Sequence, residues 1–487
     1  MDVKLILHGE LISSYYAQTL CLIMWPRAKF HEDLPIDHKP SLELWEIDEG
    51  DSYNAKAVIT TETGIYDGEF ILKKSKKLYM DDSALAIGRA FMEAAYKAGL
   101  KKMPWGLLTG VRPAKPLLAA RLAGEKTDGI TELMTEKYLV GADKAELCAE
   151  IAQSEYLTVK DLPERAVSIY ISIPFCPTRC SYCSFVSYAK PNLMALIPEY
   201  VEHLCHDIKA VANKVKELSL KVVSIYVGGG TPTTLDEDKL EKLCKAITEA
   251  FDSSYLREFC IEAGRPDTVT REKLEIMNRY GCGRISINPQ TVHNKTLQAI
   301  GRRHSAEQFF DAFALAKEVG FDSINTDLIL GLPDESGEEF LSSVNSILSL
   351  EPENITIHSF CIKKSADLAG EANSLPTLSL LPYQKKAFDE VIKNGYSPYY
   401  IYRQKNAVEN LENIGFAKKG KEGLYNIVMM EEIHSVIGIG AGASTRLVSS
   451  DGSDISRHYA PKYPFEYKDY DINDTVAYID GFYKDKY

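Results

Sequence analysis

The chain has 487 residues, of which 45% are hydrophobic and 26% charged, and its formal net charge at pH 7 is -13. This length allows two or three domains, and the composition is that of a soluble globular protein. The negative charge argues against a broad nucleic-acid footprint, no apolar run is long enough to span a membrane, and the N-terminus lacks the order of a secretory signal. We therefore expect a cytoplasmic protein that binds neither nucleic acid nor membrane.

Residues 1–160 are predicted to form a separate α+β domain with an accessory or substrate-binding role. Up to about residue 75, short runs of alternating apolar and polar residues indicate a small antiparallel sheet. From Ser83 the pattern becomes helical, and Gly99 is expected to end that helix. The break before the next unit is expected around residues 159–167.

After this break, strands and helices alternate. Six β-branched runs, "VSIYISI", "KVVSIYVG", "EFCIEAG", "GRISIN", "DSINTDLIL" and "NITIHSFCI", are separated by amphipathic helical segments. This order predicts an α/β fold with a parallel sheet, either doubly wound or curled into a full or partial barrel. We assign residues 161–375 to this core and residues 376–487 to a C-terminal region that completes the active site.

Three cysteines gather directly after the first of these strands. Cys176, Cys180 and Cys183 have the spacing C-x3-C-x2-C in "PFCPTRCSYCSF", whereas the other cysteines are scattered. A structural zinc normally takes four protein ligands, and the nearest further candidates, Cys205 and His206, lie on the following helix. A [4Fe–4S] cluster held by three cysteines leaves one iron open to a small-molecule ligand. Structural zinc and three coincidental core cysteines are the alternatives.

Polar residues stand at the end of each of the next strands. "GGGTPT" follows the second strand, Glu262 closes the third, Gln290 follows the fourth and Asp327 lies in the fifth. Because sites in parallel α/β folds gather at the carboxyl ends of the strands, we expect these groups and the cysteines to face one rim.

The stretch "YISIPFCPTRCSYC" resembles the signature of the radical S-adenosylmethionine (SAM) superfamily, in which SAM chelates the open iron. Residues 165–450 resemble the branch of the oxygen-independent coproporphyrinogen III oxidases. Within it, the long N-terminal extension and "PYYIYRQKN" are most similar to the HemZ type, the coproporphyrinogen dehydrogenases. The resemblance implies a partial (β/α)6 TIM-like barrel with an N-terminal α+β domain and a C-terminal extension. It also implies a [4Fe–4S] cluster and SAM as cofactors.

The resemblance carries roles for individual residues. The three cysteines would bind the cluster, and Tyr170 and Tyr182 would lie beside the cluster and SAM as candidate catalytic residues. The implied SAM contacts are Tyr170, Tyr182, Gly229, Gly230, Thr231, Glu262, Gln290, Arg302 and Asp327. Arg303 is the alternative to Arg302. Ser172 stands where the oxidases commonly carry a histidine, so that a polar group is kept but a proton donor is lost.

The activity implied by the resemblance is radical oxidative decarboxylation. A 5′-deoxyadenosyl radical would take hydrogen from the propionates of coproporphyrinogen III, giving the vinyl groups of protoporphyrinogen IX in haem biosynthesis. A donor such as flavodoxin or ferredoxin would reduce the cluster. A substrate with four propionates should meet basic side chains. The candidates are Arg112, Arg403 and Lys405, and further options are Lys115, Lys363, Lys364 and Arg446.

Two other functions remain open from the sequence. One is a haem chaperone of the same branch, although the His-Asn-x-x-Tyr-Trp segment typical of those relatives is not found here. The other is a different radical SAM reaction on a tetrapyrrole. The glycine-rich stretch "EEIHSVIGIGAGASTRL" is interpreted as backbone that packs closely against a ligand or the barrel.

Overall fold

The computed structural model describes the chain except residues 10–11, 26–27, 36, 76–77, 109–111, 184, 362–378, 405–406 and 487. Lys363, Lys364 and Lys405 therefore lie outside the described residues. The chain divides into two compact units, residues 1–150 and 151–487, and helix α5 (Ala142–Val159) crosses the division. Among the described residues, no helix has the length and apolar character needed to cross a membrane.

The first unit contains a five-stranded sheet in the order β2-β1-β3-β4-β5. β3, β4 and β5 are antiparallel as predicted, but β1 pairs in parallel with both β2 and β3. The expectation of a purely antiparallel sheet is wrong because α1 connects β1 to β2, and a helical crossover returns the chain in the same direction. The elements are β1 (Asp2–His8), α1 (Ser14–Met24), β2 (Lys29–His31), β3 (Ser41–Asp48), β4 (Ser52–Thr61) and β5 (Gly64–Lys73).

Helix α2 (Asp82–Lys97) packs directly on this sheet. A Cβ atom on Gly68 of β5 would lie 2.3 Å from the carbonyl oxygen of Ala90, so glycine allows the helix and the strand to approach closely. Gly99 has a φ of +95°, which glycine adopts readily, and it follows the end of the helix as predicted. Two shorter helices, α3 (Lys115–Leu122) and α4 (Asp128–Glu136), precede α5.

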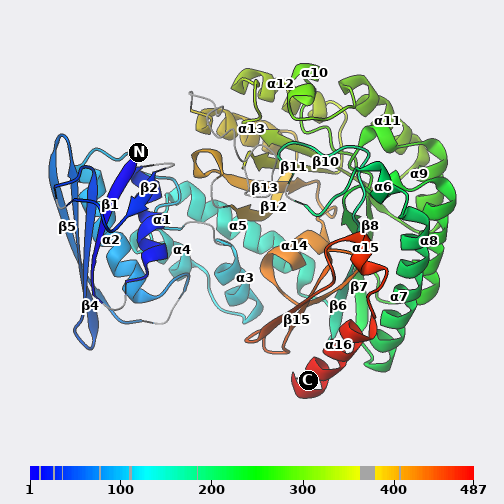
Figure 1. Cartoon of the computed structure of the whole chain (residues 1–487), viewed down its shortest axis with the longest axis horizontal. Coiled ribbons are helices and arrows are strands. Elements are labelled where there is room, and N and C mark those ends of the chain that lie inside the picture. The colour runs from blue at the N-terminus through cyan, green and yellow to red at the C-terminus, as the bar shows by residue number, and fades with distance from the viewer. Residues whose placement is uncertain are drawn as a thin grey trace. The chain divides into compact units, whose positions relative to one another are not determined.

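The core of the second unit is a run of six parallel strands in the order β11-β10-β9-β8-β7-β6. They coincide with the six predicted runs, and the predicted α/β fold class is confirmed. In Figure 1 the helices that connect them form an outer arc around the sheet. The strands are β6 (Ala166–Ile173), β7 (Lys221–Gly229), β8 (Glu258–Glu262), β9 (Arg284–Ser286), β10 (Ser323–Leu330) and β11 (Asn354–Ser359). The main outer helices are α7 (Ile197–Glu217), α8 (Glu237–Ala250), α9 (Arg271–Arg279), α11 (Ala306–Val319) and α12 (Gly337–Leu348).

Most residues of these strands are buried, as expected for parallel strands that are covered on both faces. β6, β10 and β11 each contain a single partly exposed residue, and β8 is partly exposed only at its last residue. β7 is partly exposed at its two ends and at one residue within the strand. Apart from the two ends of β7, the partly exposed residues of these five strands are Tyr170, Tyr226, Glu262, Asp327 and His358. The sheet is therefore open to solvent at a small set of polar and aromatic side chains.

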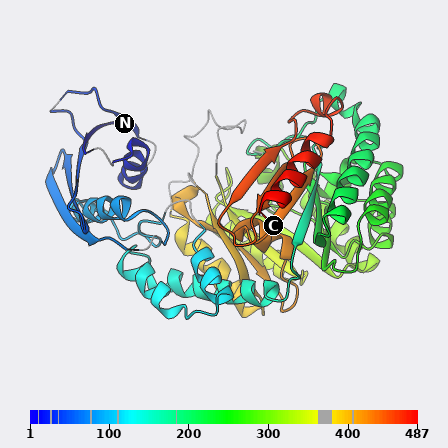
Figure 2. The ribbon, with the colours of Figure 1, turned by 90° about the horizontal axis from the view of Figure 1, so that it is seen from below.

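The C-terminal region extends the core sheet at both edges to give eleven strands. β13 (Glu412–Ala417) pairs antiparallel with β11 and carries β12 (Ser397–Arg403) on its outer side. At the other edge, β14 (Ser435–Ile439) pairs in parallel with β6 and is followed by β15 (Ser444–Val448) and β16 (Ile455–Tyr459). Figure 2 shows these orange and red strands beside the start of the core. Helices α13 (Leu381–Lys393), α14 (Leu424–Glu431) and α16 (Asn473–Lys486) complete this region.

Candidate functional site

The three clustered cysteines lie in the loop that follows β6, and each of them is partly exposed. The loop is folded back on itself, because the amide of Cys176 donates to the carbonyl of Tyr188 at 3.1 Å and that of Cys183 donates to Cys180 at 3.1 Å. The guanidinium of Arg179 reaches the carbonyls of Ser187 and Cys183 at 3.0 and 3.4 Å. We call residues 174–189 the cysteine loop.

The cysteine loop is also fixed from outside by a buried arginine. Arg265, whose side chain is 3% exposed, donates to the carbonyl and hydroxyl oxygens of Thr178 at 3.2 and 2.8 Å. Two further bonds of 2.9 Å join its guanidinium to the carboxylate of Asp267. A bidentate pair of this kind has a defined geometry. It thereby holds the segment between the first two cysteines in place.

The thiols have the chemistry that an iron–sulfur cluster requires. Burial raises the pKa of Cys176 to about 11, the hydrogen bond from Thr231 opposes this, and the charges of Cys183 and Cys180 add to it. Because the thiolate is the metal ligand, binding a metal centre here would release the thiol protons and relieve the mutual repulsion of the three thiolates. No three His, Cys, Asp or Glu side chains within the described part of the chain are grouped to hold one metal ion. A cluster places a separate iron at each cysteine, so its ligands need not converge on a single ion.

Glycines at the end of β7 bring that strand against the cysteine loop. A Cβ atom on Gly230 would lie 2.5 Å from the carbonyl oxygen of Phe175, and Gly229 has a φ of +109°. The amide of Thr231 donates to the same Phe175 carbonyl at 2.7 Å, and its hydroxyl lies 3.4 Å from the sulfur of Cys176. Gly229 and Gly230 are partly exposed, so backbone without side chains is accessible next to the first cysteine, as a close-fitting cofactor needs.

A carboxylate and three tyrosines line the next part of the rim. The hydroxyl of Tyr226 donates to Glu262. Burial raises the pKa of Glu262 to about 7, the Tyr226 bond opposes the rise, and the charge of Asp327 adds to it. The ring of Tyr226 stacks on Tyr425 of α14 with centroids 4.3 Å apart, and Tyr170 stacks beside both at 6.4 and 6.3 Å. This aromatic wall is a flat apolar surface beside an acid that ionises near neutral pH.

Asp327 belongs to a hydrogen-bonded chain that the sequence did not predict. Its carboxylate accepts a hydrogen bond from the side-chain amide of Asn325 at 2.8 Å and lies 3.6 Å from Nε2 of His358. The other ring nitrogen of His358 lies 2.8 Å from the hydroxyl of Tyr402. Burial raises the pKa of Asp327, but His358 and Asn325 outweigh it and the net pKa is below the usual value. A polar residue inside the apolar run "NITIHSF" was the signal for His358.

Gln290 and Arg302 are placed on the same rim. Gln290 has a φ of +68°, and its amide donates to the Asp327 carbonyl at 3.0 Å, which ties the loop after β9 to β10. Arg302 is buried, donates to the carbonyl of Asn288 at 2.6 Å and hydrogen bonds with Tyr182 and Cys180. The rim therefore brings together the predicted cluster and SAM residues that follow successive strands.

The predicted substrate residues are placed differently. Arg112 belongs to the first unit, in the loop before α3. Arg403 is buried and donates to the carbonyl of Asn410 at 3.1 Å. Its neighbour Tyr402 faces His358, and successive strand residues alternate in direction, so Arg403 lies on the other face of β12. Lys405 is outside the described residues.

Ser172 and the glycine-rich stretch pack against each other. The hydroxyl of Ser172 donates to the carbonyl of Ala441 at 2.8 Å, so it is occupied by backbone. A Cβ atom on Gly440 would lie 2.7 Å from the Ser172 carbonyl, and one on Gly438 would lie 2.7 Å from the carbonyl of Ser444. The glycines are therefore in close contact with strands of the barrel.

The comparisons with known proteins agree with this geometry. The sequence profile described as the Radical SAM superfamily matches residues 170–347. The oxygen-independent coproporphyrinogen-III oxidase-like protein HemZ of Bacillus subtilis is 38% identical over 371 residues, which is 75% of this chain and 74% of HemZ. The heme chaperone HemW of the same organism is 32% identical over 277 residues, 57% of this chain and 70% of HemW.

A solved structure is similar in fold. It is coproporphyrinogen III oxidase (HemN) from Escherichia coli, described as a radical SAM enzyme, with a TM-score of 0.51 and 22% identity over 67% of this chain and 71% of that one. Radical SAM proteins use a [4Fe–4S] cluster and SAM, and the three thiols, the exposed glycine backbone and the polar rim fit these cofactors. The chain belongs to the radical SAM superfamily, in the branch of the oxygen-independent coproporphyrinogen-III oxidase-like proteins.

Proposed function

We propose that this protein catalyses the oxygen-independent oxidative decarboxylation of coproporphyrinogen III to protoporphyrinogen IX. The observation that carries the proposal is the position of Tyr170, Glu262, Asp327 and His358, which are the partly exposed residues of β6, β8, β10 and β11, in the same core as the cysteine loop that follows β6. The name of the HemZ relative supplies the substrate class. We also propose that the protein works in the cytoplasm, where a reducing environment suits its free cysteines.

The cofactors and the substrate have separate tasks in this reaction. When bound, the cluster and SAM supply a carbon-centred radical that removes a hydrogen atom from an unactivated C–H bond. Each propionate that loses this hydrogen then releases CO2 and one electron, and its two remaining carbons become a vinyl group. The task of the protein is to bind, orient and shield the reacting carbon.

We propose the following roles for the rim residues. Cys176, Cys180 and Cys183 hold the cluster, and the backbone of residues 229–231 together with Glu262, Gln290, Arg302 and Asp327 binds the charged and hydroxyl groups of SAM. Tyr170 and Tyr182 flank the reacting groups. The stacked rings of Tyr226 and Tyr425 exclude water from one side.

The substrate carboxylates need cations from elsewhere in the chain. Arg112 and Lys405 are our candidates, and residues 1–160 are proposed as an accessory domain for the tetrapyrrole. Arg403 would be a third, but only for a carboxylate that reaches the face of β12 opposite Tyr402. Residues 376–487 would complete the site, because β12 supplies Tyr402 to the Asp327–His358 chain. We propose that His358 provides the imidazole that the Ser172 position lacks.

A second candidate is haem binding without catalysis. It is supported by the identity with several heme chaperones, which are 29–32% identical to this chain in Bacillus subtilis, Lactococcus lactis, Haemophilus influenzae and Escherichia coli. The absence of a His-Asn-x-x-Tyr-Trp segment from the sequence supports the oxidase instead.

An anaerobic assay separates these candidates. The protein is reconstituted with iron and sulfide, and dithionite, SAM and coproporphyrinogen III are added. We expect protoporphyrinogen together with 5′-deoxyadenosine. Deoxyadenosine without a vinyl product would point to another tetrapyrrole substrate, and tight haem binding without SAM cleavage would support the chaperone. Cys180→Ala should abolish the brown colour and the activity, whereas Cys244→Ala, in the buried part of α8, should keep both.

A further inference from the structure

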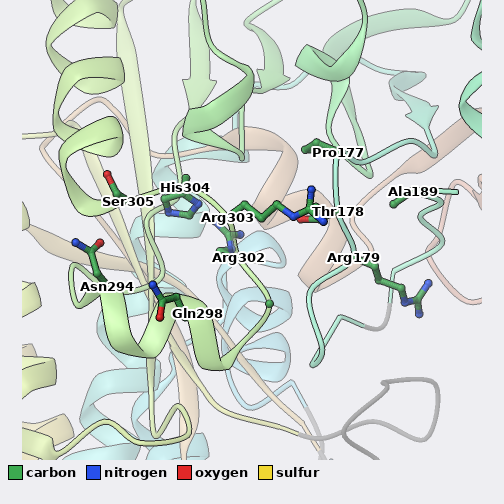
Figure 3. A pocket seen from close by; sticks show the side chains of 11 residues that line it. Pro177, Thr178, Arg179, Ala189, Asn294, Gln298, Arg302, Arg303, His304 and Ser305 are labelled. Atoms are coloured by element: carbon green, nitrogen blue, oxygen red, sulfur yellow. The ribbon is translucent and has the colours of Figure 1, made fainter. Parts of the chain in front are cut away.

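A cavity of about 940 Å³ lies on the outer side of the cysteine loop. One wall is residues 177–179 of that loop and the opposite wall is residues 301–305, as Figure 3 shows. Three arginines, Arg179, Arg302 and Arg303, are among its lining residues, and no acidic residue is. The cavity is therefore a local basic site on a chain whose formal net charge is -13.

The cavity is separated from the cluster ligands by very little protein. A Cβ atom on Gly301 would lie 3.9 Å from the Cα of Cys180, and the amide of Ser181 donates to the carbonyl of Ile300 at 3.1 Å. Arg302 lines the cavity and hydrogen bonds with Cys180 on its inner side. A molecule docked here would stand against the segment that links the first two cluster ligands.

The charges around the cavity differ in how available they are to a partner. Arg302 is buried, and Arg179 is engaged with carbonyls of the cysteine loop. Arg303 is exposed and makes no ion pair with any residue in the described part of the chain. Burial, Arg302 and Arg265 lower the pKa of His304 to about 3, so its ring is neutral. Two acidic groups lie close to the lining residues: Glu307, 3.5 Å from the side chain of Asn294, and Asp267, which is paired with Arg265.

Exposed aromatic side chains belong to the cysteine loop or contact it. Phe185 is 67% exposed, and Tyr463 and Phe465 are 41% and 45% exposed. Tyr463 contacts both Tyr188 of the loop and Phe465, with ring centroids 5.5 and 5.1 Å apart. We call Phe185, Tyr188, Tyr463 and Phe465 the aromatic patch. Aromatic side chains and arginines are the residues that protein interfaces favour.

We propose that the Arg303 cavity and the aromatic patch form the docking surface for an acidic one-electron donor protein that reduces the cluster. SAM cleavage would consume one electron from the cluster, so an external one-electron donor has to reduce the cluster before the first cleavage. A negatively charged donor would be repelled by most of the surface and attracted to the cavity. Docking there places the donor against residues 177–179, which link Cys176 to Cys180. The inference goes beyond the proposed substrate and does not depend on it.

The test measures cluster reduction and not tetrapyrrole turnover. The full chain is reconstituted, and reduced flavodoxin is mixed with it in a stopped-flow instrument while the visible absorption of the cluster is followed. Arg303→Glu should lower the second-order rate constant about threefold to tenfold at low salt and reduce its dependence on ionic strength. Dithionite is small and needs no docking surface, so its reduction rate should stay the same.

Two further variants make the result specific. Arg257→Glu reverses the charge of another exposed arginine, just before β8 at the opposite end of the strands, and should leave the flavodoxin rate unchanged. Phe465→Ser should slow flavodoxin while leaving the salt dependence as it is. The proposal would be overturned by an unchanged flavodoxin rate in Arg303→Glu, or by an equal loss in Arg257→Glu. It would also be overturned if dithionite slowed as much as flavodoxin, because the variant would then have altered the cluster itself.

Discussion

At the scale of single residues, the Asp327–His358–Tyr402 chain is the feature that the structure adds to the site. His358 lies 3.6 Å from the Asp327 carboxylate and 2.8 Å from the Tyr402 hydroxyl, and its side chain is partly exposed. The imidazole favours the ionised form of Asp327. It is thus a positioning residue for the carboxylate and a candidate proton donor near the substrate.

Replacing His358 by glutamine should separate these effects. We expect turnover of coproporphyrinogen III to fall by about a hundredfold, the lower end of what a proton-transferring group contributes. Because His358 lowers the pKa of Asp327, the carboxylate should protonate at higher pH in His358→Gln, and SAM affinity should be lost first on the acidic side. Calorimetric SAM titrations between pH 5 and pH 8 would measure this. His206→Gln, on the exposed face of α7, is the control. An unchanged pH profile of SAM binding would exclude the positioning role.

Glu262 should make SAM binding depend on pH around neutrality. Its pKa is about 7 because burial disfavours the carboxylate. The sulfonium and ammonium groups of SAM are cations and are bound better by the ionised form, so affinity should rise as pH increases from about 6 to 8. Glu262→Gln should remove this rise while keeping the shape of the side chain. The prediction fails if the variant and the wild-type protein show the same pH dependence in the calorimeter.

At the scale of elements, the glycines that end β7 determine how closely two loops approach. A side chain on Gly230 would collide with the backbone of Phe175, which cannot move without displacing the cysteine loop. Gly230→Ala should therefore lower the iron content after reconstitution and destabilise the protein by about 1–3 kcal/mol. Gly481→Ala in α16 meets nothing within 4 Å and should be neutral or slightly stabilising. Iron analysis and thermal melts of both variants would decide, and full iron content in Gly230→Ala would contradict the steric argument.

The elements also explain how much the sequence could predict. The six core strands were predictable because buried parallel strands are continuous β-branched runs, and residues that follow them share a rim by topology. The parallel pairing of β1 was missed because α1 lies in an apolar run whose helical period is weak. His358 and Tyr402 were missed because their meeting depends on the antiparallel pairing of β13 with β11, which brings β12 alongside. Pairing between strands far apart in sequence leaves no local pattern.

At the scale of the whole molecule, a buried pair of acids links folding stability to pH. Glu155 of α5 is fully buried, its two carboxylate oxygens lack hydrogen bonds, and the charge of Glu431 on α14 acts on it. Burial and this like charge raise the pKa of Glu155 well above its ordinary value. The folded protein therefore keeps a proton on Glu155 at pH values where the unfolded chain has released it. The free energy of unfolding consequently falls as pH rises above about 4.5, by up to about 1.4 kcal/mol per pH unit until the folded pKa is reached.

Glu155→Gln removes this titration while keeping the volume of the side chain. We expect the variant to be more stable than the wild-type protein at pH 8, by about 1–3 kcal/mol, and nearly equal to it at about pH 3.5, below the ordinary pKa of glutamate, where the wild-type acid is protonated in both states. Glu150→Gln, one turn and a residue earlier on α5, is the matched control, because Glu150 is exposed and no like charge raises its pKa. Denaturant titrations of the apo protein at the two pH values would measure the difference. If the variant gained the same free energy of unfolding at both pH values, the cause would be packing. Removal of the Glu155 charge, which forms only between the two pH values, should instead give a larger gain at the higher pH.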